Sequence, residues 1–201
     1  MEKRLIKKDA LAGIARKMAG DLQVWAPVKK EDNVLFAPLG SGDEPFFAYL
    51  NSKNAPKNVF FPHTETMMKF TRTEKGMVFS SEENKADHSV LFGVRPCDAH
   101  SFVLLDKLFD QAKYKDGYYI AKRESTTVIS LACVKPPYAT CFCTSVDGEP
   151  VSSEGADILL TDIGGDYLVE FVTEKGEKLA NYFGDTKADA AADTKKAEVA
   201  A

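Results

Sequence analysis

Four cysteines are the residues of this chain whose types and spacing suit a definite chemistry. Cys97 stands apart, whereas Cys133, Cys141 and Cys143 form a Cys-x7-Cys-x-Cys pattern, and the chain contains no other cysteine. Four thiols are the number needed to complete one tetrahedral zinc site or to hold one iron–sulfur cluster. The sequence therefore indicates metal chemistry, provided that the surrounding elements bring the four thiols together.

Two continuous apolar runs precede the first two cysteines. Residues 89–95 and residues 126–132 both have strand length and the composition of strands buried on both faces of a parallel sheet. Between them, residues 99–109 have helical spacing, with Asp98 as the expected N-cap, and a turn follows at residues 115–117. This order predicts a βαβ unit, right-handed and with parallel strands.

The predicted unit places the cysteines at one edge of the sheet. Cys97 directly follows the first strand and Cys133 directly follows the second. The carboxyl ends of parallel strands share an edge, which is where open α/β sheets place ligand sites. The loop of residues 134–144, stiffened by Pro136-Pro137, then carries Cys141 and Cys143 back over this edge. We therefore expect all four thiols to converge.

The flanking segments extend this unit to an α/β (mixed α+β) fold, a small sheet with the βαβ unit at its centre and the metal-cluster loops at the carboxyl edge of the strands. We expect a helix over residues 8–20, a strand over 23–28 that Pro27 confines to a sheet edge, short strands with irregular loops over 34–62, and a hairpin of residues 156–162 and 167–172 around Gly164-Gly165.

The domain organisation follows from composition. We predict one cluster-binding domain over residues 1–184 and a low-complexity Ala/Lys tail over residues 185–201, which is either disordered or a weak, solvent-facing helix. The apolar stretches Phe60-Phe61 and Met67–Phe70 suit either a docking face or core strands, and strand propensity favours core strands.

The spacing of the cysteines favours an iron–sulfur cluster. Structural zinc sites prefer Cys-x2-4-Cys pairs, which the sequence lacks. Cys141-Phe142-Cys143 sets two thiolates one residue apart with an apolar side chain between them to limit water access. The amides at the start of the predicted helix, together with Arg95 and Lys135, would favour negative charge there. Structural zinc, a thiol–disulfide switch and inert buried cysteines are the alternatives.

Composition narrows the class of protein. With 44% hydrophobic residues and 13 Phe in 201 residues the chain can build a core, and its net charge of −4 argues against a broad nucleic-acid surface. We expect neither a signal peptide nor a membrane span, and hence a cytoplasmic protein. His100 lies three residues after Cys97 and suits a ligand or proton relay, but a helix-surface position is the commoner outcome. The sequence has no Walker, GxGxxG or GxSxG motif, so we expect no substrate chemistry by the chain alone.

Several stretches carry a family resemblance. They are residues 24–29, 56–62, 91–98, 117–119 and 123–124, followed by Cys133 and the Cys141-Phe142-Cys143 segment. In these stretches the sequence resembles the N-terminal domain of the iron–sulfur β subunit of sulfhydrogenases, which are cytosolic nickel–iron hydrogenases, and the related iron–sulfur component of anaerobic sulfite reductase. The Gly-Val-x-x-Cys-Asp and Cys-Phe-Cys segments are its specific parts.

The resemblance implies that Cys97, Cys133, Cys141 and Cys143 bind a [4Fe–4S] cluster. It implies an electron-transfer subunit, not itself catalytic, within a larger cytoplasmic oxidoreductase complex of anaerobic metabolism. The implied partners are a catalytic subunit together with a flavin- or ferredoxin-type subunit, with neither nucleic acid nor membrane. Members of the family carry a further ferredoxin-like domain with two more cluster motifs. We expect that module to be a separate polypeptide or to be replaced by a different redox partner.

Overall fold

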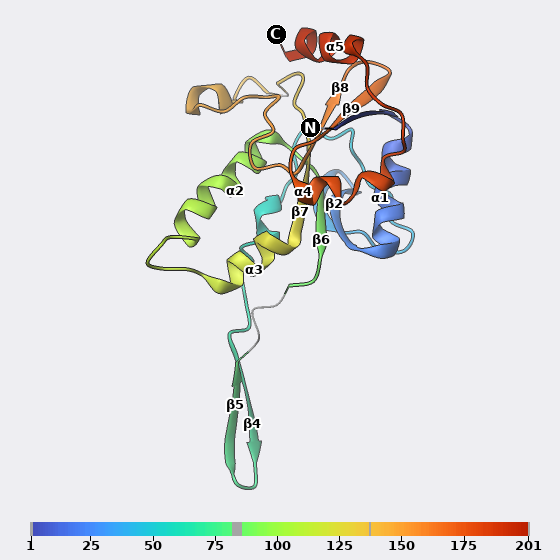
Figure 1. Cartoon of the computed structure of the whole chain (residues 1–201). Helices are drawn as coiled ribbons and strands as arrows, with labels where there is room; N and C mark the ends of the chain where they lie inside the picture. Colours follow the sequence, from blue (N-terminus) through green and yellow to red (C-terminus); the bar gives the residue numbers. More distant parts are fainter. Residues whose placement is uncertain (1, 82–85, 137, 201) are drawn as a thin grey trace.

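A mixed seven-stranded sheet forms the centre of the computed structural model, which describes residues 2–81, 86–136 and 138–200 (Figure 1). In spatial order its strands are β1 (Lys3–Lys7), β9 (Asp166–Phe171), β8 (Ile158–Asp162), β7 (Thr126–Leu131), β6 (Ser89–Val94), β2 (Gln23–Lys30) and β3 (Asn33–Pro38). The four strands β2, β6, β7 and β8 are mutually parallel, and β3, β9 and β1 pair antiparallel. The predicted α/β fold class is therefore confirmed, as is the hairpin formed by β8 and β9.

The central βαβ unit is also confirmed. All six residues of β6 are buried, and β6 pairs in parallel with β7. Their connection contains α2 (Pro96–Phe109) and a helix that the sequence did not suggest, α3 (Gly117–Ser125). The predicted cap of α2 is wrong, because Arg95 is the N-cap and Asp98 lies in the first turn. Proline at the first helical position is pre-organised for a helix start, so Pro96 begins the helix earlier than predicted.

Helices cover both faces of the sheet and create two separate cores. One core lies under α1 (Ala10–Asp21) and the segment around η3 (Ala180–Tyr182); the other lies under α2, α3 and η1 (Pro56–Val59). Neighbouring residues of β6 serve opposite faces, with Phe92 in the first core and Leu91 in the second. None of the four cysteines, all of which are among the described residues, belongs to either core.

The predicted edge position of the strand containing Pro27 is wrong. β2 lies between β6 and β3, yet its pairing with β6 covers only Gln23, Val24 and Trp25. Pro27 lies beyond that short pairing, so its missing N–H removes no bond to β6. A proline is therefore compatible with an interior strand here.

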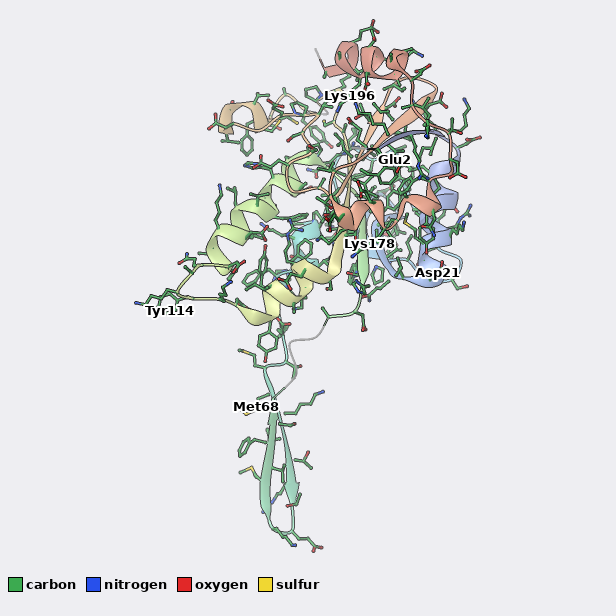
Figure 2. All side chains as sticks on the ribbon, in the orientation of Figure 1. Glu2, Asp21, Met68, Tyr114, Lys178 and Lys196 are labelled. Carbon is green, nitrogen blue, oxygen red and sulfur yellow. The ribbon has the colours of Figure 1, made fainter. Side chains whose placement is uncertain are left out.

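The segment between β3 and β6 sends a long hairpin away from the body of the molecule (Figure 1, Figure 2). β4 (Met68–Thr73) and β5 (Gly76–Ser81) pair only with each other. Phe70 is 68% exposed, so the prediction of a core strand over Met67–Phe70 is right about the strand and wrong about the core. Phe60 is buried as expected for a core residue, but it follows the short 3-10 segment η1 instead of lying in a strand.

The Ala/Lys-rich end of the chain forms helix α5 (Ala190–Ala200). Ala192 is buried against Ile163 and Leu168, and Lys196 forms an ion pair with the buried carboxylate of Glu170 in β9. Of the two alternatives for this segment, the helix is the one observed, and one of its faces packs on the sheet. The domain boundary at residue 184 stays a prediction.

Candidate metal centre

The four cysteines lie at the carboxyl edge of the parallel strands. Cys97 lies in the first turn of α2, directly after β6, and Cys133 lies two residues after the end of β7. The loop that follows β7 carries Cys141 and Cys143, and Cys143 begins the short 3-10 segment η2 (Cys143–Val146). This loop lies at the end of the molecule opposite the β4–β5 hairpin (Figure 1). All four thiols are free; Cys97 and Cys141 are exposed, and Cys133 and Cys143 are half-buried.

The thiols lie close enough to influence one another electrostatically. Burial raises the pKa of Cys97 to about 11, and Asp98, Cys143 and Cys133 raise it further. Burial likewise raises the pKa of Cys133; Arg95 opposes the shift, and Cys141 and Cys143 add to it. Each of the four thiols therefore interacts with at least one other. Across the described part of the chain, however, no group of three or more His, Cys, Asp or Glu side chains has the arrangement of a metal site.

Arg95 joins the two strand ends that carry Cys97 and Cys133. From its N-cap position on α2, its Nη1 donates to the carbonyl oxygens of Leu131 and Ala132 at 3.4 Å each, at the end of β7. Its Nη2 donates to the carbonyl oxygen of Tyr49, and its guanidinium lies 4.6 Å from the centre of the Tyr49 ring. Its Nε is buried without a hydrogen-bond partner among the described residues. Arg95 thus places a positive charge with spare donor capacity between the two cysteine-bearing ends.

A bulge in β6 makes room for this arrangement. Gly93 has φ +85°, and the register with β7 shifts between Phe92 and Val94. A side chain on Gly93 would come within 2.8 Å of the Phe47 ring, and the Gly93 carbonyl accepts a hydrogen bond from the buried Tyr49 hydroxyl at 2.7 Å. Glycine is required here because the backbone has positive φ and a ring packs directly against it.

The cysteine loop is fastened at several points. The amide of Cys133 donates to the carbonyl of Pro150 at 2.8 Å, and the amide of Gly148 donates to the carbonyl of Cys143 at 2.9 Å. Further along, Gly155 (φ +77°) lies against the carbonyl of Ala99 in α2. These contacts tie both ends of the loop to the βαβ unit. Pro137, half of the predicted stiffening pair, lies outside the described residues.

Other expected contributors have ordinary roles or partial ones. The Nδ1 atom of His100 lies 2.8 Å from a carboxylate oxygen of Glu154, so the ring is held on the surface of α2. The amides of Asp98 and Ala99 donate to the carbonyl of Arg95 at 3.0 Å each, so these two helix-start amides are engaged within the turn. Phe142 is 66% exposed and does not shield the neighbouring cysteines as predicted.

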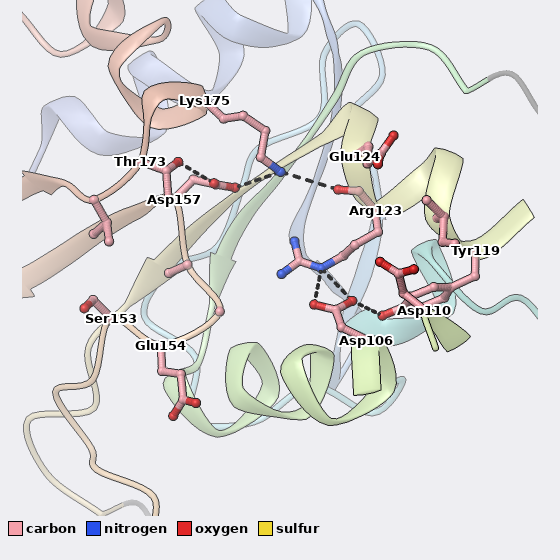
Figure 3. Close-up of a pocket in the computed structure, with 14 residues that line it drawn as sticks. Asp106, Asp110, Tyr119, Arg123, Glu124, Ser153, Glu154, Asp157, Thr173 and Lys175 are labelled. Atoms are coloured by element: carbon pink, nitrogen blue, oxygen red, sulfur yellow. Dashed lines mark hydrogen bonds and ion pairs between the residues drawn. The ribbon is translucent and has the colours of Figure 1, made fainter. Parts of the chain in front are cut away.

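A second concave site lies at the opposite, amino edge of β7, and no sequence motif indicated it. This cleft of about 700 Å³ lies between α2, α3 and the segments flanking β8 and β9 (Figure 3). Its cations are paired: Arg123 Nε lies 3.2 Å from both carboxylate oxygens of Asp106, and Lys175 Nζ lies 3.6 Å from Asp157 Oδ2. Lys175 also donates to the carbonyl of Thr126 at 3.0 Å. These internal pairs connect the elements around the cleft, and nothing in their arrangement indicates a ligand.

The described helices include none that is long and apolar enough to span a bilayer.

The chain is similar to the β subunit of sulfhydrogenase 2 from Pyrococcus furiosus, with 29% identity over 156 residues. The aligned region covers 78% of this chain and 44% of that protein, so the chain spans less than half of the relative's length. No family model matches the chain, and no solved structure matches it significantly. The similarity confirms the resemblance to sulfhydrogenase β subunits that the sequence motifs predicted.

Proposed function

We propose that this chain is an electron-transfer subunit of an oxidoreductase complex and that it binds one [4Fe–4S] cluster through Cys97, Cys133, Cys141 and Cys143. The observation that carries the proposal is the position of four free, mutually interacting thiols at one sheet edge. The similarity to a sulfhydrogenase β subunit supports the assignment to a redox complex. Such a cluster, when bound, accepts and releases one electron at a time.

The residues at this edge fit an anionic cluster with soft ligands. Thiolates are the ligands that iron–sulfur clusters use, and the chain supplies four of them from a helix start and a loop. The buried Nε of Arg95, which has no partner among the described residues, leaves a cationic donor next to Cys133. A neighbouring positive charge and hydrogen bonds to sulfur are among the features that set the potential of such sites.

Binding requires the thiols to lose their protons. Because burial and neighbouring thiols raise the pKa values of Cys97 and Cys133, both remain protonated at neutral pH in the free chain. A bound cationic centre reverses this preference, and the protons are released to solvent. The chain's own contribution is therefore to hold the four sulfur atoms near one another and to accept their deprotonation when the centre forms.

The surface next to the cysteines suits a docking partner. Four large apolar side chains of the cysteine loop are exposed, namely Val134, Tyr138, Phe142 and Val146. Exposed apolar side chains concentrated in one loop are typical of an interaction surface. We infer that a flavin- or ferredoxin-type subunit docks here to exchange electrons and that a catalytic subunit completes the complex. We place the complex in the cytoplasm, where clustered cysteines remain reduced and serve as metal ligands.

The test is to produce and purify the full chain without oxygen and to quantify iron, acid-labile sulfide and zinc per chain. The proposal expects about four irons and four sulfides per chain, with visible absorption that bleaches on adding dithionite. Cys141→Ser should lose or convert the centre, whereas His100→Gln, at a ring already paired with Glu154, should retain it. About one zinc per chain and no colour would instead establish the structural zinc module, and the electron-transfer assignment would be wrong.

A further inference from the structure

The β4–β5 hairpin has one strongly apolar face and one more polar face. In the register of the two strands, Phe70 lies opposite Phe79 and Arg72 lies opposite Met77, with Met68 one pair further along the same face. Directly opposed residues of an antiparallel pair share a face, and alternate residues of a strand do so too. The opposite face includes the pair of Thr71 with Val78. The first face, called the arm face below, consists of Met68, Phe70, Arg72, Met77 and Phe79.

The arm face is bare in the structure. Met68, Phe70, Met77 and Phe79 are exposed by 59%, 68%, 62% and 61%, and within the face the rings of Phe70 and Phe79 lie 6.5 Å apart. An isolated two-stranded hairpin is only marginally stable in water, and a contiguous exposed apolar patch marks an interaction site. The arm face therefore has the properties of a surface that is covered in the assembled protein.

The base of the hairpin is fixed to the body. The hydroxyl of Tyr118 in α3 donates to the carbonyl of Met67 at 3.2 Å, and Lys122 of the same helix forms an ion pair with Glu65. α3 precedes β7 and so lies at the amino edge of the parallel strands, whereas the cysteines lie at the carboxyl edge. The hairpin points away from the cysteine loop (Figure 1). A partner held by the hairpin thus contacts a different end of the molecule from the metal centre.

Charge indicates the nature of that partner. Residues 68–81 contain three cations, Lys69, Arg72 and Lys75, against one carboxylate, Glu74, which gives a net charge of +2. Because the whole chain has a net charge of −4, the remaining residues carry −6. Complementary charge steers two surfaces together and fixes their relative orientation. A groove that accepts the arm face should therefore be apolar at its floor and bear carboxylates at its rim.

We propose that the arm face docks into an apolar, carboxylate-rimmed groove on another subunit of the complex. This inference rests on the proposed function, which makes the chain one of several subunits. A second copy of the chain is the poorer occupant. Its body has the matching negative charge, but its cleft between α2 and α3 is lined largely by charged side chains, including Asp106, Arg123 and Lys175. Such a lining does not match the phenylalanine and methionine side chains of the arm face.

The experiment uses the full chain, tagged and produced without oxygen in its native host together with its complex. The photo-crosslinking residue p-benzoylphenylalanine replaces Phe79 in one preparation and Thr71, on the opposite face, in a control. We expect the Phe79 position to cross-link to a different subunit, at a peptide of apolar residues flanked by Asp or Glu. The Thr71 position should cross-link much less.

A matched pair of variants measures the contribution of the face. Phe70→Ser with Phe79→Ser should reduce the amount of co-purified partner subunit roughly tenfold or more, because it removes two exposed aromatic anchors. The control Thr71→Ser with Val78→Ser changes the opposite face and should retain the partner. Both variants should keep the iron content and unfolding midpoint of the unmodified chain, since the altered side chains lie outside both cores.

Retention of the partner by the Phe70→Ser, Phe79→Ser variant would overturn the proposal. A Phe79 cross-link to a second copy of the chain would also overturn it, in favour of self-association. An unmodified chain that lacks iron but still cross-links to a different protein through Phe79 would support the docking surface and overturn the cluster assignment. The two proposals therefore fail in different measurements.

Discussion

At the scale of single residues, Gly155 controls how closely the cysteine loop approaches α2. Its φ is +77°, and a Cβ there would overlap the carbonyl oxygen of Ala99. Gly155→Ala should therefore combine backbone strain with displacement of the loop. We expect a loss of at least about 2 kcal/mol in the free energy of unfolding, measured by urea denaturation, together with fewer irons per chain.

Gly164→Ala is the control for this prediction. Gly164 also has positive φ, at +108°, but nothing lies within 4 Å of the position of its added Cβ. This variant should lose only the conformational contribution, about 1 kcal/mol, and keep its iron. Equal losses in the two variants would show that the contact with Ala99 does not hold the loop in place.

Arg95 is the residue whose loss should affect the metal centre through its surroundings. Arg95→Lys keeps a positive charge but cannot span the carbonyls of Tyr49, Leu131 and Ala132 in the same way. We expect it to cost about 1–3 kcal/mol in the free energy of unfolding. Arg95→Met also removes the charge and should make the midpoint potential more negative than in Arg95→Lys, because a neighbouring cation favours the reduced state.

Lys135→Met serves as the control for the Arg95 variants. Lys135 is exposed, and its backbone carbonyl, which the substitution retains, accepts a hydrogen bond from the Cys133 thiol at 3.4 Å. The free energy of unfolding should stay within about 0.5 kcal/mol of the unmodified chain. A potential that is the same in Arg95→Met and Arg95→Lys would refute the electrostatic role assigned to Arg95.

At the scale of elements, α3 depends on a cap that the sequence analysis overlooked. The side chain of Asp116 accepts hydrogen bonds from the amides of Tyr118 and Tyr119 at 3.0 Å each. Asp116→Ala should lower the free energy of unfolding by about 1 kcal/mol, whereas Asp116→Asn retains an acceptor and should lose only a small part of that. Chemical denaturation of the three proteins checks this, and equal stability of Asp116→Ala and the unmodified chain would contradict it.

The elements differ in how far the sequence could predict them. β6 and β7 were predictable because each is a continuous apolar run, the pattern of a strand buried on both faces. Helix α3 was missed because its nine residues follow a turn signal and contain few apolar positions at helical spacing. β4 was predicted as a strand, but its exposure could not be foreseen, since an apolar strand has the same sequence pattern in a core and on a projecting arm.

The candidate site was predictable to the same depth. The βαβ pattern placed Cys97 and Cys133 at one edge, because that placement follows from parallel strands. Nothing local in the sequence indicates that Arg95 reaches Tyr49, because the two residues lie on separate elements 46 positions apart. Contacts of this kind are set by tertiary packing, and only the assembled fold reveals them.

At the scale of the whole molecule, the fold should persist without its metal. Both cores consist of residues on the sheet and its covering helices, and none of the four cysteines, each of them described, contributes to either. Removal of the metal centre by a chelator with an oxidant should therefore leave the far-ultraviolet circular dichroism spectrum nearly unchanged. The thermal midpoint should fall, because a ligand that binds only the folded state stabilises it.

The response to metal removal should concentrate in the cysteine loop. Limited proteolysis should cut the metal-free protein within the stretch from Cys133 to Pro150, whose anchors are few, while β6, β7 and α2 stay protected. Cys97→Ser, purified without oxygen, should show the same cleavage pattern before any chelation. Global unfolding of the metal-free chain would mean that the centre holds the whole fold together, as in small zinc domains. Selective cleavage of the loop would instead show a stable scaffold on which only the metal-binding segment becomes ordered.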